Sequence, residues 1–100
     1  MYFFVVFSFD TDMENTVNRS DISSALEELG LRFLIKLPEE KELINLPKNT
    51  FIGEYEYSDR KELKNMLYRE ITRVFHEHNI SGNIFLSVSE KAVIGVDYIG

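Results

Sequence analysis

The sequence predicts one α+β domain over residues 1–100, with elements in the order β-α-β-β-α-β and a further strand after them. Residues 2–9 form a near-continuous apolar and aromatic run, which is typical of a strand buried on both faces of a sheet. Residues 20–29 and 59–79 carry apolar side chains at helical spacing. Shorter segments of strand character lie between and after these two helices.

The first helix is predicted to follow a polar loop over residues 10–19. Ser20 is a good N-cap, because its hydroxyl can accept a free N–H of the first turn. One face of the helix is apolar, with Ile22, Ala25, Leu26 and Leu29 at i, i+3, i+4 and i+7. Gly30 is the residue type that commonly follows the last turn of a helix.

The next two strands are separated by a polar segment. Residues 31–37 predict the second strand, which Pro38 ends, because four apolar residues alternate with Arg32, Leu34 and Lys36. Residues 38–49 are too polar and too interrupted by proline for the core, so we expect a loop there. Residues 50–57 are predicted to form the third strand, with Phe51, Tyr55 and Tyr57 on one side.

The second helix is predicted over residues 59–79, opened by a capping-box-like pair of acidic residues. Residues 83–89 form the fourth strand, and residues 90–91 are expected to turn the chain so that residues 92–98 form a fifth. This order is the split pattern of a ferredoxin-like fold. Right-handed crossovers place both helices on one face of an antiparallel sheet, with the first strand between the third and the fourth.

This architecture leaves the second face of the sheet uncovered. A contiguous apolar patch of that kind usually marks a partner surface. The sequence therefore predicts a homodimer, formed through the open sheet face or by pairing of edge strands, and a different protein partner is an alternative.

The composition restricts the class of function. The chain has 17 acidic and 11 basic residues and a net charge of −6, which disfavours RNA as a partner. Without cysteine, the chain can form no disulfide, thiolate zinc site or cysteine nucleophile, as is compatible with the cytoplasm. The longest apolar run is about half of what a membrane helix needs, and no basic segment precedes it. We expect a cytoplasmic protein that does not enter a membrane.

Two acidic residues follow the first strand directly, Asp10 and Asp12. Carboxylates on a loop can hold Mg²⁺, which commonly takes one or two of them together with water and phosphate oxygens. The alternative interpretation is that both acids only solvate the turn.

The run Phe7-Ser8-Phe9-Asp10-Thr11 resembles the F-D-L-D-T segment that ends the first strand in the virulence-associated protein D family. Those proteins are small ferredoxin-like ribonucleases, related in fold to small CRISPR-associated nuclease-fold proteins. Residues 26–32, a helix that passes through glycine into a strand, also fit the family's layout. The resemblance implies that Asp10 is the metal-binding or catalytic acid. The family's first acid is Ser8 here, and a hydroxyl that stays protonated at neutral pH cannot replace a carboxylate.

Four further side chains are candidates for binding. Tyr55 and Tyr57 are aromatic enough to stack RNA bases, although neighbouring glutamates repel phosphate and a core or dimer contact is the alternative. Arg69 and Arg73 lie one helical turn apart and can meet phosphates, or can form ion pairs with the glutamates interleaved between them. The sequence has no Gly-rich phosphate loop and no nucleophile elbow.

Three hypotheses follow. The first is an interaction protein without a cofactor, a homodimer and a catalytically degenerate relative of those ribonucleases, serving a mobile element or a toxin–antitoxin system. The second is a Mg²⁺-dependent endoribonuclease that uses Asp10, assisted by Asp12. The third is a small-molecule-sensing regulatory domain, which no Gly-rich ligand loop supports.

Overall fold

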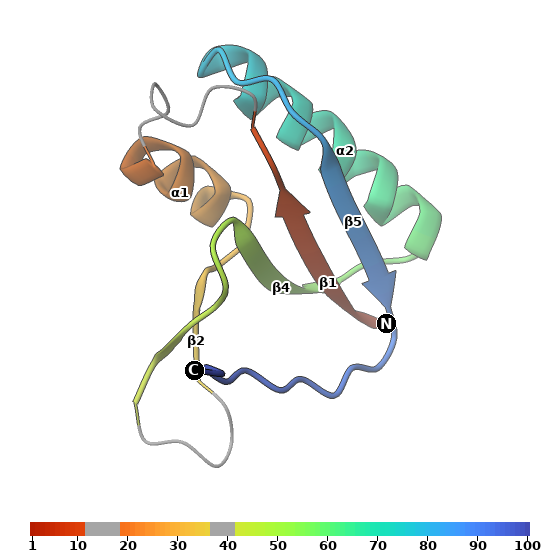
Figure 1. The fold of residues 1–100 in the computed structure, drawn as a ribbon. Coiled ribbons are helices and arrows are strands. Elements are labelled where there is room, and N and C mark those ends of the chain that lie inside the picture. The colour runs from red at the N-terminus through yellow and green to blue at the C-terminus, as the bar shows by residue number, and fades with distance from the viewer. Residues whose placement is uncertain (12–18, 37–41) are drawn as a thin grey trace.

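The computed structural model describes residues 1–11, 19–36 and 42–100. Within these ranges the elements are β1 (Tyr2–Phe9), α1 (Arg19–Glu28), β2 (Leu34–Ile35), β3 (Ile44–Asn45), β4 (Thr50–Glu56), α2 (Arg60–Glu77) and β5 (Ile84–Ser89). An antiparallel sheet has the order β4-β1-β5, and β2 and β3 form a separate two-stranded sheet. The predicted α+β class is confirmed, and the arrangement is consistent with a ferredoxin-like fold (Figure 1).

β1 lies in the centre of the three-stranded sheet, as predicted, because β4 and β5 pair with its two edges. Its odd-numbered residues Phe3, Val5 and Phe7 are at most 3% exposed. Its even-numbered residues from Phe4 to Ser8 are only half-buried. Directly opposed residues of an antiparallel sheet point to the same face. The sheet therefore has a covered face, which carries the odd-numbered residues of β1, and an open face, which carries the even-numbered ones.

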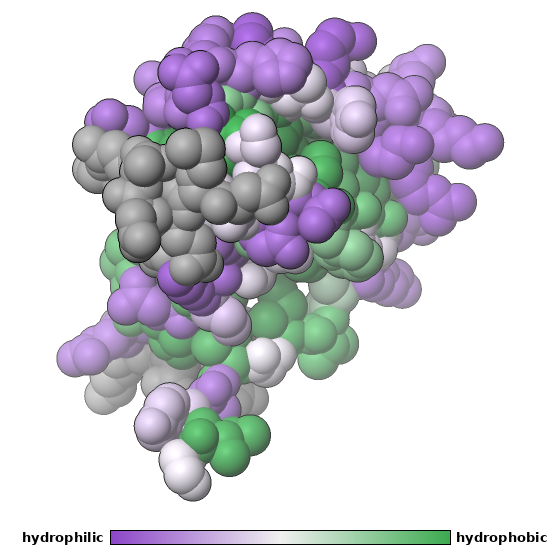
Figure 2. All heavy atoms as spheres, turned by 45° about the horizontal axis from the view of Figure 1, so that its top comes forward, coloured by the Kyte–Doolittle hydropathy of each residue, from purple (hydrophilic) through white to green (hydrophobic). Residues whose placement is uncertain are grey.

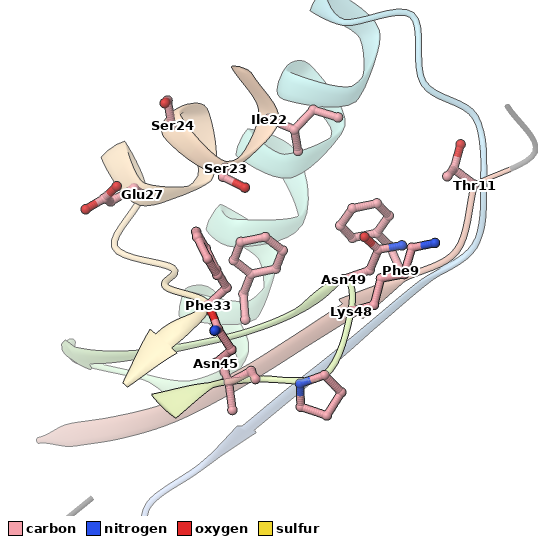
Figure 3. Close-up of a pocket in the computed structure, with 13 residues that line it drawn as sticks. Phe9, Thr11, Ile22, Ser23, Ser24, Glu27, Phe33, Asn45, Lys48 and Asn49 are labelled. Carbon is pink, nitrogen blue, oxygen red and sulfur yellow. The ribbon is translucent and has the colours of Figure 1, made fainter. Parts of the chain in front are cut away.

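Both helices lie on the covered face (Figures 1 and 3). They bury their apolar stripes against β1 and β4 in a single core. The core consists of Phe3, Val5, Phe7, Ile22, Leu26, Leu31, Phe51, Leu63, Leu67, Ile71, Phe75 and Ile80. Hydrophilic side chains dominate the upper and right-hand parts of the surface, where α2 lies (Figure 2). The amphipathic pattern of the sequence therefore gave the correct inner face of each helix.

The helix ends follow their sequence signals. The Asp59 carboxylate accepts the Glu62 N–H at 3.0 Å and caps α2, as the pair of acids predicts. α1 begins at Arg19, one residue before the predicted N-cap. Gly30 follows α1 with a φ of 92°, and its N–H donates to the Glu27 carbonyl at 2.9 Å. Glycine is favoured there because a side chain strains the left-handed conformation.

The second strand is shorter than predicted. Of the described residues 31–36, Leu34–Ile35 form a strand, and Arg32 joins the edge of β4 by one bridge to Ile52. The physical reason is a competing partner, β3, inside the segment expected to be a loop. Arg32 still exchanges two backbone hydrogen bonds with Ile52 of β4. From Phe33 onward the backbone bonds to β3 instead, because the Phe33 carbonyl accepts the Leu46 N–H at 2.8 Å.

The predicted fifth strand is wrong. Residues 91–100 have no regular structure and leave the end of β5 without turning back (Figure 1). A two-residue hairpin loop requires positive φ, which Gly, Asn and Asp accept most readily. Glu90 and Lys91 do not have positive φ. The chain therefore continues past the sheet, and Val93, Tyr98 and Ile99 are almost fully exposed.

The side chain of Tyr55 connects β4 to the residues that directly follow α1. The Tyr55 hydroxyl donates to the Leu29 carbonyl at 2.5 Å, and its ring lies over Gly30 and Gly53. A Cβ at Gly53 would lie 2.5 Å from the Gly30 carbonyl oxygen, so the backbones approach too closely for any side chain. Burial raises the pKa of Tyr55 from about 10 to about 12.

Tyr55→Phe is expected to lower the free energy of unfolding by about 1 kcal/mol, because the Leu29 carbonyl loses its donor. The wild type should also lose stability between pH 10 and 12, because the tyrosine of the unfolded chain ionises first and ionisation then favours unfolding. Urea denaturation of both proteins across this pH range measures both effects. Tyr2→Phe is the control, since Tyr2 is 70% exposed. Equal destabilisation by the two substitutions would contradict the prediction.

Candidate functional site

Asp10 lies at the end of β1 and joins it to the start of β5. Its N–H donates to the Asn83 carbonyl at 3.0 Å, and its carboxylate Oδ1 accepts the Asn83 N–H at 2.9 Å. One oxygen of the candidate acid is therefore engaged with the backbone of the neighbouring strand. The side chain is exposed, so the other oxygen stays accessible to solvent.

The loop before β5 passes very close to Asp10. A Cβ at Gly82 would lie 1.8 Å from the Asp10 carbonyl oxygen, and the atom it meets belongs to the backbone. Only glycine fits there without a shift of the chain. The close approach of Gly82 and the two hydrogen bonds between Asp10 and Asn83 together fix the position at which β1 ends.

The other acid of the predicted pair, Asp12, lies outside the described residues. Ser8, which stands where the resembling family has its first acid, is on the open face with Thr50 and Phe85 opposite it. Among the described residues, no group of three or more His, Asp or Glu side chains is placed to hold a metal ion. A Mg²⁺ ion here would rely on the free oxygen of Asp10 and on oxygens of its substrate.

Of the two candidate tyrosines, Tyr55 lies on the covered side of β4 and Tyr57 directly follows the end of that strand. Tyr55 is held by its hydrogen bond to the Leu29 carbonyl, directly after α1, and its ring covers two glycines. Tyr57 is half-buried against the core, and its N–H donates to the Met1 carbonyl at 2.9 Å. Both side chains therefore have packing roles that account for their positions.

The two candidate arginines lie on α2. Arg73 bridges Glu70 at 2.8 Å and Glu77 at 2.9 Å. These two hydrogen-bonded carboxylates raise the pKa of Arg73 above its ordinary value. Arg69 is exposed on the same helix. The charge of Arg73 is balanced by its own helix, which reduces its attraction for phosphate.

A cavity of about 550 Å³ lies between α1, the β2–β3 hairpin and the turn that precedes β4 (Figure 3). Its size is that of a small-molecule site. Apolar side chains contributed by five segments line it, namely Phe9, Ile22, Phe33, Leu46, Pro47 and Phe51. Polar side chains border it, namely Thr11, Ser23, Ser24, Glu27, Asn45, Lys48 and Asn49.

The rings of the cavity belong to one aromatic cluster. Phe9 and Phe51 are stacked with centroids 6.3 Å apart, and Phe33 meets Phe51 edge-on at 6.0 Å. Phe33 remains 38% exposed, because it faces the cavity rather than the core. The sequence does not predict this site, because its residues are far apart in the chain and β3, one strand of the hairpin that brings them together, lies in the segment 38–49 that was expected to be a loop.

No helix among the described residues is long and apolar enough to cross a membrane. Comparison with known proteins found no matching family model, no matching curated protein and no matching solved structure.

Gly82→Ala is expected to lower the free energy of unfolding by about 1–3 kcal/mol, because the new Cβ overlaps the Asp10 carbonyl. Gly95→Ala is the matched control, since no atom lies within 4 Å of a Cβ at that position. Thermal or urea unfolding measures the difference. Equal stability of the two variants would show that the close approach at Gly82 does not exist in solution.

Proposed function

We propose that this protein is an interaction module that has no active site and works as a homodimer, through the open face of its sheet and the outer edge of β5, with which no described strand pairs. The open face supports this proposal. An antiparallel sheet with one solvated face normally carries polar side chains there. Here Phe4, Val6 and Ile52 are half-buried at its centre, and Tyr2 and Phe85 are 70% and 60% exposed beside them.

The position of Asp10 favours an interaction role over catalysis. Its carboxylate already accepts a backbone N–H, and the hydroxyl at Ser8 is directed to the open face. The resemblance to the virulence-associated protein D ribonucleases then fits a degenerate relative that has kept the strand and changed one acid. Such a protein would act by binding, within the cytoplasm and in a toxin–antitoxin system or a mobile element.

A second candidate function is regulation by a small molecule, and the cavity between α1 and the β2–β3 hairpin favours it. Three phenylalanine rings and a polar rim suit an uncharged planar ligand that stacks on the rings and hydrogen-bonds to Asn45 or Asn49. Such a ligand would contact both α1 and the β2–β3 hairpin. Its binding would therefore favour the arrangement in which the hairpin lies close to α1.

Phe85→Glu is expected to raise the dissociation constant of the homodimer at least tenfold, because the ring lies on the open face of an edge strand. Tyr68→Glu is the matched control: Tyr68 is 58% exposed, but on α2. Sedimentation or light scattering over a range of concentrations measures the association. A wild type that stays monomeric at several hundred micromolar would overturn the proposal.

The enzymatic alternative has its own test. Incubation with structured RNA in Mg²⁺ or in chelator, for the wild type and for Asp10→Ala, is expected to give no cleavage in any arm. Cleavage that needs both the metal and Asp10 would establish the endoribonuclease instead. Asp10→Asn keeps an oxygen that can accept the Asn83 N–H, so it separates loss of a catalytic charge from loss of stability.

A further inference from the structure

The chain contains a free strand edge and an unpaired apolar segment, side by side in sequence. β5 pairs with β1 on one edge, and no described strand pairs with the other. Directly after it, residues 92–99 are rich in apolar residues but have no regular structure. Val93, Tyr98 and Ile99 are 105%, 87% and 93% exposed. Figure 1 shows this segment running away from the end of β5.

The outer edge of β5 lacks the features that protect free edges from pairing. Such edges usually carry charges, proline or a bulge. β5 has none of these over the six residues Ile84–Ser89. The opposite edge of the sheet differs, because β4 carries Glu54 and Glu56 and is bridged by Arg32. The unprotected edge is therefore the one next to the unpaired segment.

The segment does not pair with β5 of its own chain, because residues 90–91 lack the backbone conformation of a hairpin loop. We propose that residues 92–99 pair instead with the free edge of β5 in a second copy of the chain, in a reciprocal exchange. This inference rests on the proposed homodimer and specifies how it forms. It joins the two sheets into one continuous sheet and covers both exposed edges.

Symmetry restricts how the two copies align. A two-fold axis that relates adjacent antiparallel strands is perpendicular to the sheet, so each residue keeps its face in both copies. Opposed residues also share a face, so one residue must lie opposite its own copy. Glu90 or Lys91 in that position would place like charges together, which is destabilising. Ser89 there would leave Tyr98 beyond the end of β5, whereas Ala92 avoids both problems.

With Ala92 on the axis, apolar residues meet along the ladder. Val88 lies opposite the partner's Val96, Leu86 opposite the partner's Tyr98, and Phe85 opposite the partner's Ile99. The first two pairs lie on the covered face, because Val88 and Leu86 oppose Val5 and Phe7 there. Phe85 and Ile99 form an aromatic and β-branched pair of the kind that stabilises a sheet, and the other two pairs bring apolar side chains together.

A shallow groove of about 140 Å³ lies where the partner's Val96 and Tyr98 would pack. Leu86 and Val88 line it together with three cations of α2, Arg60, Lys61 and Lys64. Its charge is opposite to the net charge of −6 of the chain, so it is a favourable place for a second acidic copy. The partner's Tyr98 would lie beside Leu86, within reach of these cations, which attract the face of an aromatic ring.

The absence of native cysteine makes the alignment testable by crosslinking. Ala92→Cys places two thiols opposite each other in the dimer and should give a covalent dimer under mild oxidation. Glu90→Cys is the control two residues away, because it lies opposite the partner's residue 94. Its two copies are about 14 Å apart, beyond the reach of a disulfide. In the uncrosslinked protein, Gly95→Pro with Val96→Pro should raise the dimer dissociation constant at least tenfold, because one of these adjacent N–H groups must point to the partner.

These results separate the exchange from the homodimer itself. A covalent dimer with Ala92→Cys alone, and weaker association of the double proline variant, support the exchange. A wild-type dimer that the prolines do not weaken, or in which Glu90→Cys crosslinks as well as Ala92→Cys, overturns the exchange and leaves the homodimer standing. A wild type that is monomeric at several hundred micromolar overturns both. Circular dichroism of the proline variant checks that the core, from which residues 92–99 are absent, stays folded.

Discussion

The rest of the structure depends on the double pairing of β1. Its backbone bonds to β4 on one edge and to β5 on the other, and its odd-numbered side chains form the floor on which both helices pack. The Asp10–Asn83 pair and the close approach at Gly82 fix the point at which this strand leaves the sheet. The best candidate for a catalytic acid is therefore also part of the framework.

Local signals were enough to predict the centre of the fold. The apolar run of residues 2–9 is typical of a strand inside a sheet, and β1 is paired on both edges. The acidic cap at Asp59 predicts the start of α2 correctly. Each of these signals depends on residues within one element. They are reliable because the packing of each element agrees with its own sequence.

The elements that the sequence did not predict depend on competition between partners. Residues 31–37 have the alternation of a strand, but alternation does not say which backbone will accept the hydrogen bonds, and the hairpin with β3 takes them from β4. Residues 92–98 also have strand character, but the turn chemistry of Glu90 and Lys91 keeps them from β5 of the same chain. The aromatic cavity was missed for the same reason, since the unpredicted hairpin forms one of its walls.

The distance along the chain between β1 and β5 has a consequence for biosynthesis. β1 is translated before both of its neighbours, and β5 emerges on the order of ten seconds after it at ordinary elongation rates. Throughout this interval the most hydrophobic segment of the protein has a bare edge in a crowded cell. An unpaired hydrophobic edge of this kind is prone to non-native pairing until β5 arrives to cover it.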